Sequence, residues 1–173
     1  MTKQELAAAI RQAAYLEGDF VLSSGKRSHY YLDKWRFLTS PVLLRQLASA
    51  LAELLPAPVP DRIAGAELGG VPLATALSLG TGIPCLVVRR QPKDYGTGQE
   101  VEGLFASGER IVLAEDVLTT AAQAISAAQR LTQLGLEVER VLYVVDREEG
   151  AAENIRKAGF EPAPLFWKTE LGI

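Results

Sequence analysis

The feature that most constrains the fold is a series of five short apolar runs with helical patterns between them. The runs lack the apolar–polar alternation of a half-exposed strand, so they are typical of strands buried on both faces. Residues 71–80, 121–134 and 148–158 have helical periodicity and fill three of the gaps. This alternation favours a parallel sheet with helices on both sides. The apolar runs are Arg62–Ala66, Cys85–Arg89, Arg110–Ala114, Val141–Val145 and Pro164–Trp167.

The N-terminal part of the chain has a different pattern. Residues 3–16 predict a helix, and the extended runs Phe20–Leu22 and Tyr30–Asp33 predict a hairpin. Ser40-Pro41 is typical of a helix start, and that helix should continue to about Leu55. We therefore expect a doubly wound α/β fold, with a mostly parallel sheet of about five strands, in one domain spanning 1–173. Residues 1–38, the hood segment, should lie beside an α/β core of residues 39–173.

Composition excludes several classes of protein. The chain has 18 Lys and Arg against 21 Asp and Glu, and this net charge of −3 argues against a nucleic-acid binder. Cys85 and His29 are the only cysteine and histidine, which leaves little for disulfides, zinc sites or Ser-His-Asp chemistry. No apolar run approaches the roughly 20 residues of a membrane span, and the charged N-terminal helix does not resemble a cleaved signal. We expect a cytoplasmic protein that binds no membrane.

Ligands of such folds bind at the carboxyl ends of the strands, and the third apolar run ends in the sharpest motif of the chain. Glu115 and Asp116 follow Ala114, and Thr119-Thr120 leads into a helix. Adjacent carboxylates on an extended chain point to opposite sides, so one of them can reach the hydroxyls of a ligand. Threonine hydroxyls and the N–H groups of a new helix suit a phosphate. A solvated acidic turn capped by Thr119 explains the same residues about equally well.

Three other loops carry polar groups at predicted strand ends. Arg89, Arg90 and Lys93 form a basic loop, expected to be mobile to about Gly103, which suits an anion or is simply solvated. The loop Glu67-Leu68-Gly69-Gly70 can bring backbone N–H groups close to an anion, or is an ordinary strand-to-helix turn. Arg147 suits a carboxylate ligand, or belongs to a surface cluster with its acidic neighbours.

The stretch around Glu115 resembles the sugar-diphosphate motif of the type I phosphoribosyltransferases. The resemblance implies that the acidic pair binds ribose and that the following loop binds the 5′-phosphate. This chain departs from the family pattern, because it has Ala121-Ala122-Gln123 where glycines are usual. A required φ above zero would strain alanine by about 1 kcal/mol, whereas a loop that simply enters a helix would tolerate it. The residues carried over are Glu115, Asp116, Val117, Leu118, Thr119, Thr120, Ala121, Ala122 and Gln123.

Other segments resemble the orotate phosphoribosyltransferases in particular. The basic loop through Tyr95-Gly96 and then Glu102-Gly103 is similar to their flexible loop, which implies that Arg89, Arg90, Lys93 and Tyr95 bind the diphosphate. Their diphosphate loop resembles Glu67, Leu68, Gly69 and Gly70, and their Asp-Arg-x-x-Gly motif implies that Arg147, with Thr119, binds orotate. The hairpin from Phe20 to Tyr31 resembles their hood over the base, although Ser23 stands where some members have lysine and Lys26 has no assigned role.

The resemblance implies a reaction of orotate with 5-phosphoribosyl 1-diphosphate that gives orotidine 5′-monophosphate and diphosphate. Lys93 is the implied catalytic residue, Mg²⁺ the cofactor, held mainly by substrate oxygens, and a homodimer with shared active sites the assembly. Two alternatives stay open: a purine-type phosphoribosyltransferase and a non-enzymatic regulator that senses the sugar diphosphate.

Overall fold

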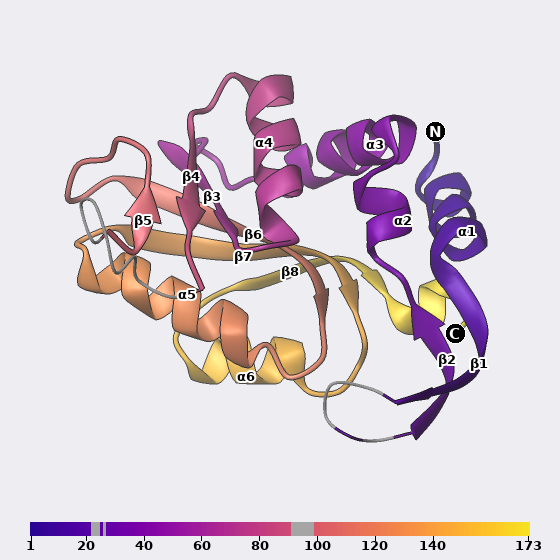
Figure 1. Cartoon of the computed structure of the whole chain (residues 1–173). Coiled ribbons are helices and arrows are strands. Elements are labelled where there is room, and N and C mark those ends of the chain that lie inside the picture. Colours follow the sequence, from indigo (N-terminus) through magenta and orange to yellow (C-terminus); the bar gives the residue numbers. More distant parts are fainter. Residues whose placement is uncertain (22–24, 26, 91–98) are drawn as a thin grey trace.

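The computed structural model describes residues 1–21, 25, 27–90 and 99–173, and its centre is a six-stranded sheet (Figure 1). The strand order is β5-β4-β3-β6-β7-β8, and every pairing is parallel except that of β4 with β5. The α/β prediction is confirmed, with one antiparallel edge strand beyond the five expected. The strands are β3 (Arg62–Ala66), β4 (Cys85–Val88), β5 (Val101–Glu102), β6 (Arg110–Leu118), β7 (Glu137–Asp146) and β8 (Pro162–Trp167).

Helices cover both faces of this sheet, as the apolar runs predicted. On one face lie α3 (Pro41–Ala52) and α4 (Gly70–Thr81), and on the other lie α5 (Ala122–Gln133) and α6 (Ala151–Lys157). Ser40 caps α3 through a hydrogen bond from Leu43 N–H, and Gly82 ends α4 with φ 77°. The start of α3 was predicted from Ser40-Pro41.

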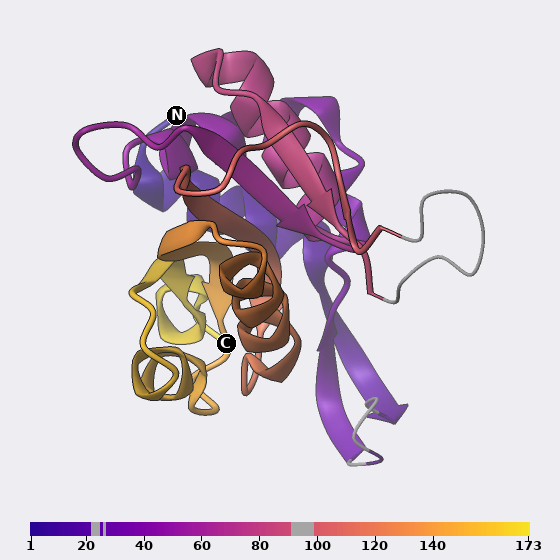
Figure 2. The same ribbon diagram turned by 90° about the vertical axis from the view of Figure 1, so that its left-hand side faces the viewer.

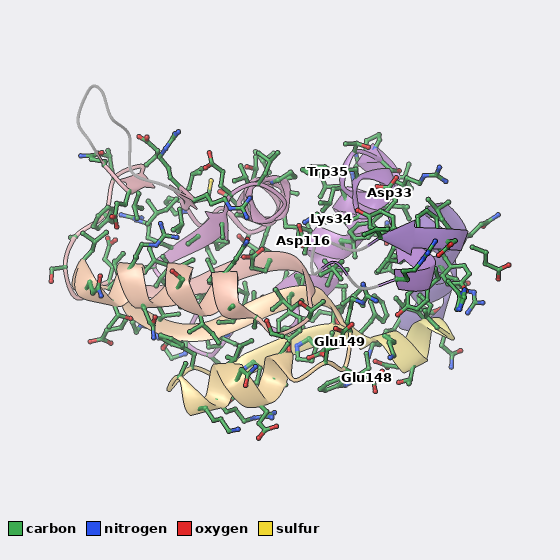
Figure 3. All side chains as sticks on the ribbon, turned by 60° about the horizontal axis from the view of Figure 1, so that its bottom comes forward. Asp33, Lys34, Trp35, Asp116, Glu148 and Glu149 are labelled. Carbon is green, nitrogen blue, oxygen red and sulfur yellow. The ribbon has the colours of Figure 1, made fainter. Side chains whose placement is uncertain are left out.

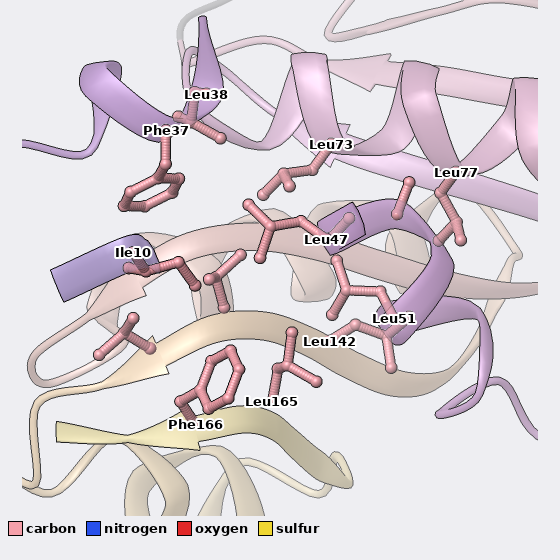
Figure 4. Close-up of a cluster of buried hydrophobic side chains, with 14 of the residues drawn as sticks. Ile10, Phe37, Leu38, Leu47, Leu51, Leu73, Leu77, Leu142, Leu165 and Phe166 are labelled. Atoms are coloured by element: carbon pink, nitrogen blue, oxygen red, sulfur yellow. The ribbon is translucent and has the colours of Figure 1, made fainter. Parts of the chain in front are cut away.

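The N-terminal helix is part of the core rather than a separate appendage. Helix α1 (Lys3–Ala14) buries Leu6 and Ile10 in the same cluster as residues of α2 (Trp35–Leu38), α3 and α4. Figure 4 labels Ile10 in this cluster. Phe37 of α2, a helix that sequence reasoning missed, is fully buried there. A 3₁₀ turn (Lys168–Leu171) closes the chain against α1, where Arg11 donates to the Leu171 carbonyl at 2.8 Å.

The hairpin of β1 (Tyr15–Val21) and β2 (Arg27–Leu32) is antiparallel and projects away from the packed layers (Figure 2). Strand β1 follows α1 directly, so the helix predicted to residue 16 ends at Ala14. None of the helices in the described residues combines the length and apolar character that crossing a bilayer requires.

Two boundaries near the predicted ligand edge also differ from expectation. Strand β6 continues four residues past Ala114, because β7 pairs with it as far as Leu118. Helix α6 begins at Ala151 instead of residue 148, since Glu148 and Gly150 adopt positive φ values of 58° and 98° in the turn before it.

Candidate active site at the topological switch point

The chain reverses its direction of travel across the sheet between β3 and β6, and a cleft of about 590 Å³ lies at their carboxyl ends. Doubly wound sheets bind ligands at such switch points because loops diverge there. The predicted site residues that line the cleft come from the end of β6 and from the loops after β3, β4, β6 and β7. Three residues of the hood segment line it as well. The lining residues are Glu67, Leu68, Gly69, Arg90, Glu115 to Gln123 and Arg147, with Tyr31, Lys34 and Trp35 from the hood segment.

The acidic pair lies inside β6 rather than in a loop after it, which corrects the predicted strand end. Strand β3 stops pairing with β6 at Ala114, whereas β7 continues alongside Glu115. The end of β6 therefore extends past its shorter neighbour and borders the loop after β3. Glu115 faces α5 and borders Gln123 and Ser126, while Asp116 faces the opposite side, as expected for adjacent strand residues.

Asp116 is held by groups from the hood segment and from its own strand. Lys34 Nζ lies 2.7 Å from Asp116 Oδ2, and the Asp116 side chain is only 4% exposed. The other carboxylate oxygen accepts the Val117 N–H. Sequence reasoning missed Lys34, because only the tertiary fold brings residue 34 to residue 116. Figure 3 labels the two residues side by side.

Glu115 has a raised pKa, which favours its protonated form at neutral pH. Burial, followed by the negative charge of Asp116, raises the pKa of Glu115 from 4.5 to about 8, and Lys34 offsets only part of this increase. Desolvation disfavours the charged form, and a second carboxylate one residue away disfavours it further. The pair therefore presents one carboxylate and one carboxylic acid, and the acid can donate a hydrogen bond to a ligand hydroxyl.

Gly69, in the loop after β3, packs directly against Asp116. A Cβ at Gly69 would stand 1.5 Å from Asp116 Oδ2, so no side chain fits there. A Cβ at Gly70 would meet the Ala114 carbonyl oxygen at 2.3 Å. Glu67 accepts a hydrogen bond from Arg90 N–H at 3.0 Å, which joins this loop to the end of β4. The two glycines thus let the loop backbone approach the acidic pair closely.

The sequence left two conformations open for the loop after β6, one with a positive φ at an alanine and one that enters the helix without strain. The structure has the positive φ. Ala121 is buried, has φ 62° and precedes α5 with no side-chain cap. A left-handed alanine costs about 1 kcal/mol relative to a relaxed backbone. Thr119 and Thr120 are exposed beside it, and the first N–H groups of α5 have no acceptors within the helix. Hydroxyls and N–H groups at a helix N-terminus together suit a phosphate.

Arg147 is held in a defined orientation by the hood segment and by its own loop. Its Nη2 donates to Tyr30 Oη at 2.9 Å, and its Nε lies 3.3 Å from Glu149 Oε1. The turn beneath it is fixed by Asp146, which accepts from Tyr143 Oη at 2.8 Å and from Glu148 N–H at 2.7 Å. These contacts leave Nη1 and the second Nη2 hydrogen for a planar acceptor such as a carboxylate.

The basic loop is only partly covered by the structure. Arg90 is exposed and lines the cleft, whereas Arg89 pairs with Glu102 at 3.5 Å and borders a smaller adjoining cavity of about 320 Å³. Arg130 donates to the Arg89 carbonyl at 2.6 Å. The predicted site residues Lys93 and Tyr95 lie outside the described residues. Of the remaining predicted residues, Gly70 and Arg89 are not part of the main cleft wall.

The described residues contain no group of three or more His, Cys, Asp or Glu side chains arranged to hold a metal ion.

Known proteins resemble this chain along its whole length. No model of a protein family matches it. It is 44% identical to an orotate phosphoribosyltransferase of Natronomonas pharaonis, with 99% of this chain and 98% of the relative covered. A Pyrococcus abyssi protein of the same description is also 44% identical, with 98% and 94% covered.

Solved structures give the same result for the three-dimensional fold. An orotate phosphoribosyltransferase from Mycobacterium tuberculosis superimposes with a TM-score of 0.88 at 32% identity, covering 99% of both chains. A complex of that protein with 5-phospho-α-D-ribosyl 1-diphosphate gives 0.84 at 30% identity, again over 99% of both chains. An adenine phosphoribosyltransferase from Leishmania donovani, at 20% identity and TM-score 0.72, shares the fold alone. Similarity of this extent, along nearly all of both sequences, shows that the chain belongs to the orotate phosphoribosyltransferase family.

Proposed function

We propose that the chain transfers the phosphoribosyl group of 5-phosphoribosyl 1-diphosphate to orotate, giving orotidine 5′-monophosphate and diphosphate. The observation that carries the proposal is the position of Arg147 in the same cleft as the Glu115–Asp116 pair and the Thr119–Gln123 loop. A site for a carboxylate-bearing base thus adjoins groups suited to a sugar and a phosphate. The relatives named for this activity support the proposal.

Each part of the cleft is assigned one part of the substrates in this proposal. The Thr119–Gln123 loop binds the 5′-phosphate, and Glu115 and Asp116 bind the ribose hydroxyls, one as hydrogen-bond donor and one as acceptor. Residues 67–70 bind the diphosphate through backbone N–H groups. Arg147, with Thr119, binds the orotate carboxylate through the guanidinium edge that Tyr30 and Glu149 leave open.

Catalysis in this proposal needs alignment and positive charge rather than a protein nucleophile. The bond from ribose C1 to diphosphate breaks as the bond to the orotate nitrogen forms, so negative charge grows on the leaving group. Arg89, Arg90, Lys93 and Tyr95 are assigned to that charge by the family resemblance, with Lys93 as the catalytic residue. Mg²⁺, held mainly by substrate oxygens, would withdraw charge from the diphosphate when bound.

The proposal includes a homodimer with shared active sites, in the cytoplasm. In the family pattern, the basic loop serves the site of the neighbouring subunit. A lone cysteine is compatible with a reducing compartment. Light scattering coupled to size-exclusion chromatography would test the dimer, and a monomeric mass in the active protein would refute it.

The deciding experiment follows orotate ultraviolet absorbance after mixing with phosphoribosyl diphosphate and Mg²⁺. We expect loss of absorbance with orotate and no reaction with adenine, guanine or hypoxanthine. The variant Arg147→Ala should lower kcat/KM for orotate by about 100-fold, because charged hydrogen bonds are lost in the transition state. Turnover of a purine instead of orotate would favour the purine-type alternative. Binding of the sugar diphosphate without turnover of any base would favour a regulator.

A further inference from the structure

Lys34 is a cation of the cleft that the family resemblance left without a role. It lies at the start of α2 in the hood segment, and its Nζ is 2.7 Å from Asp116 Oδ2. The Lys34 side chain is 34% exposed, whereas its partner is 4% exposed. The exposed part of Lys34 faces the cleft, because Lys34 is one of the residues that line it. The ammonium therefore joins a buried carboxylate to an open ligand site.

The position of this ammonium relative to the loop after β3 is well defined. The same Oδ2 that pairs with Lys34 lies 1.5 Å from the place where a Cβ of Gly69 would stand. Lys34 Nζ and the Gly69 backbone thus both lie against the Asp116 carboxylate. The 67–70 loop is the part of the cleft assigned to the diphosphate. A cation from the hood segment stands where that loop and the ribose-binding pair adjoin.

The donor capacity of Lys34 exceeds what Asp116 uses. An ammonium has three N–H donors, and one carboxylate oxygen at 2.7 Å occupies one of them. Lys34 Nζ also lies 6.0 Å from the centroid of the Trp35 ring, which does not accept a conventional hydrogen bond. Two donors remain for anionic oxygens in the cleft, and the raised pKa of Glu115 favours a smaller negative charge on the acidic pair.

We propose that Lys34 is a diphosphate-binding residue, whose ammonium contacts the diphosphate of the substrate and of the product while Asp116 holds it in position. This inference rests on the proposed function and adds a residue to it. Lys34 then supplies positive charge from the hood segment, in addition to the charge assigned to the basic loop after β4. The competing explanation is that Lys34 only neutralises Asp116 and so preserves the ribose contact.

Inorganic diphosphate separates these two explanations, because it contains no ribose. Its affinity in the presence of Mg²⁺ would be measured by titration calorimetry for the wild type, Lys34→Met and Lys34→Arg. We expect Lys34→Met to weaken diphosphate binding by about tenfold or more, since a hydrogen bond between charged groups is lost. Lys34→Arg should retain most of the affinity. Wild-type affinity in folded Lys34→Met protein would overturn the proposal.

The matched control is Lys3→Met, which makes the same change in another lysine–carboxylate pair. Lys3 Nζ lies 2.9 Å from Glu170 Oε1, away from the cleft, so diphosphate affinity should stay within twofold of wild type. A loss as large as that of Lys34→Met would show a general charge effect and would overturn the proposal. Thermal unfolding of each variant establishes that the protein titrated is folded.

A double-mutant cycle with Asp116→Asn tests whether Lys34 acts directly. We expect Lys34→Met to weaken diphosphate binding in the Asp116→Asn background as well, because the ammonium itself contacts the ligand. Disappearance of the effect in that background would mean that Lys34 acts only through Asp116, and would refute the inference. Failure of the proposed function is seen separately, because the wild type would then consume no orotate with phosphoribosyl diphosphate.

Discussion

Gly69→Ala is expected to destabilise the protein, although the backbone at this position suits alanine. The φ and ψ of Gly69 are −73° and −25°, ordinary helical values. In open space, replacing this glycine would stabilise the fold by about 0.4–1 kcal/mol, because the unfolded chain loses conformational freedom. The cost arises entirely from contact, since the new Cβ would stand 1.5 Å from Asp116 Oδ2 and 2.6 Å from its Cγ.

The size of the destabilisation depends on the displacement of the Asp116 carboxylate by the new Cβ. The Asp116 side chain is short and 4% exposed, so its carboxylate can leave the Cβ only by abandoning Lys34. Breaking a buried ion pair costs about 3–5 kcal/mol when the carboxylate keeps its charge. After the gain from the unfolded chain is deducted, the free energy of unfolding should fall by about 2–4 kcal/mol. Binding of phosphoribosyl diphosphate should weaken at the same time.

Equilibrium unfolding in urea measures this effect, with Gly80→Ala as the matched control. Gly80 lies in α4, the helix that Gly69 precedes, and a Cβ there meets nothing within 4 Å. That variant should be more stable than wild type by about 0.5–1 kcal/mol. In an Asp116→Ala background, Gly69→Ala should cost little, because the clashing carboxylate is absent. Wild-type stability for Gly69→Ala, or an equal cost in both backgrounds, would refute the reasoning.

Four further outcomes are expected. The pKa of Glu115 is raised from 4.5 to about 8, so the folded state binds a proton more readily than the unfolded chain, and the free energy of unfolding should fall as pH rises through this window. In Glu115→Gln, the free energy of unfolding should not show this decline between pH 5 and pH 8.5. An equal decline in the variant and the wild type would contradict the expectation. Tyr30→Phe should raise the KM for orotate about five- to tenfold with a smaller change in kcat, because Arg147 loses the hydroxyl to which it donates. Tyr15, whose ring stacks on that of Tyr30, is the control, and Tyr15→Phe should leave the KM for orotate unchanged. Lys93→Ala should reduce turnover far more than orotate binding, and equal turnover would remove its assigned role. MgCl₂ alone should shift the melting temperature no more than NaCl of equal ionic strength, but should shift it further with phosphoribosyl diphosphate, if the metal arrives with the substrate.

The sequence was sufficient to predict the sheet and the position of the acidic pair, because both depend on local patterns. Runs without alternation identified the buried strands, and their carboxyl ends identified the ligand edge. The end of β6 could not be located in this way. Its last four residues are strand only because β7 extends alongside them, and pairing between distant segments has no local signature.

The conformation of Ala121 and the role of Lys34 were beyond sequence reasoning for different reasons. An alanine carries no preference for positive φ, so its left-handed backbone is imposed by the junction of β6 with α5. Lys34 follows Asp33 in a segment with no motif around it. Its partner is 82 positions away in the chain, and only the packing of the hood segment on the core brings them together.

Among the described residues, Lys34 contacts Asp116 and Tyr30 contacts Arg147, so two side chains of the hood segment reach the cleft, and we expect the order of the hood segment to depend on ligand binding. A two-stranded hairpin is marginally stable by itself, so its protection against hydrogen exchange should depend on these contacts. A ligand that binds the arrangement in which these contacts are made stabilises it by an amount that grows with the logarithm of the ligand concentration. Amide exchange in β2 should therefore slow as phosphoribosyl diphosphate is added, so that the hairpin reports the occupancy of the cleft.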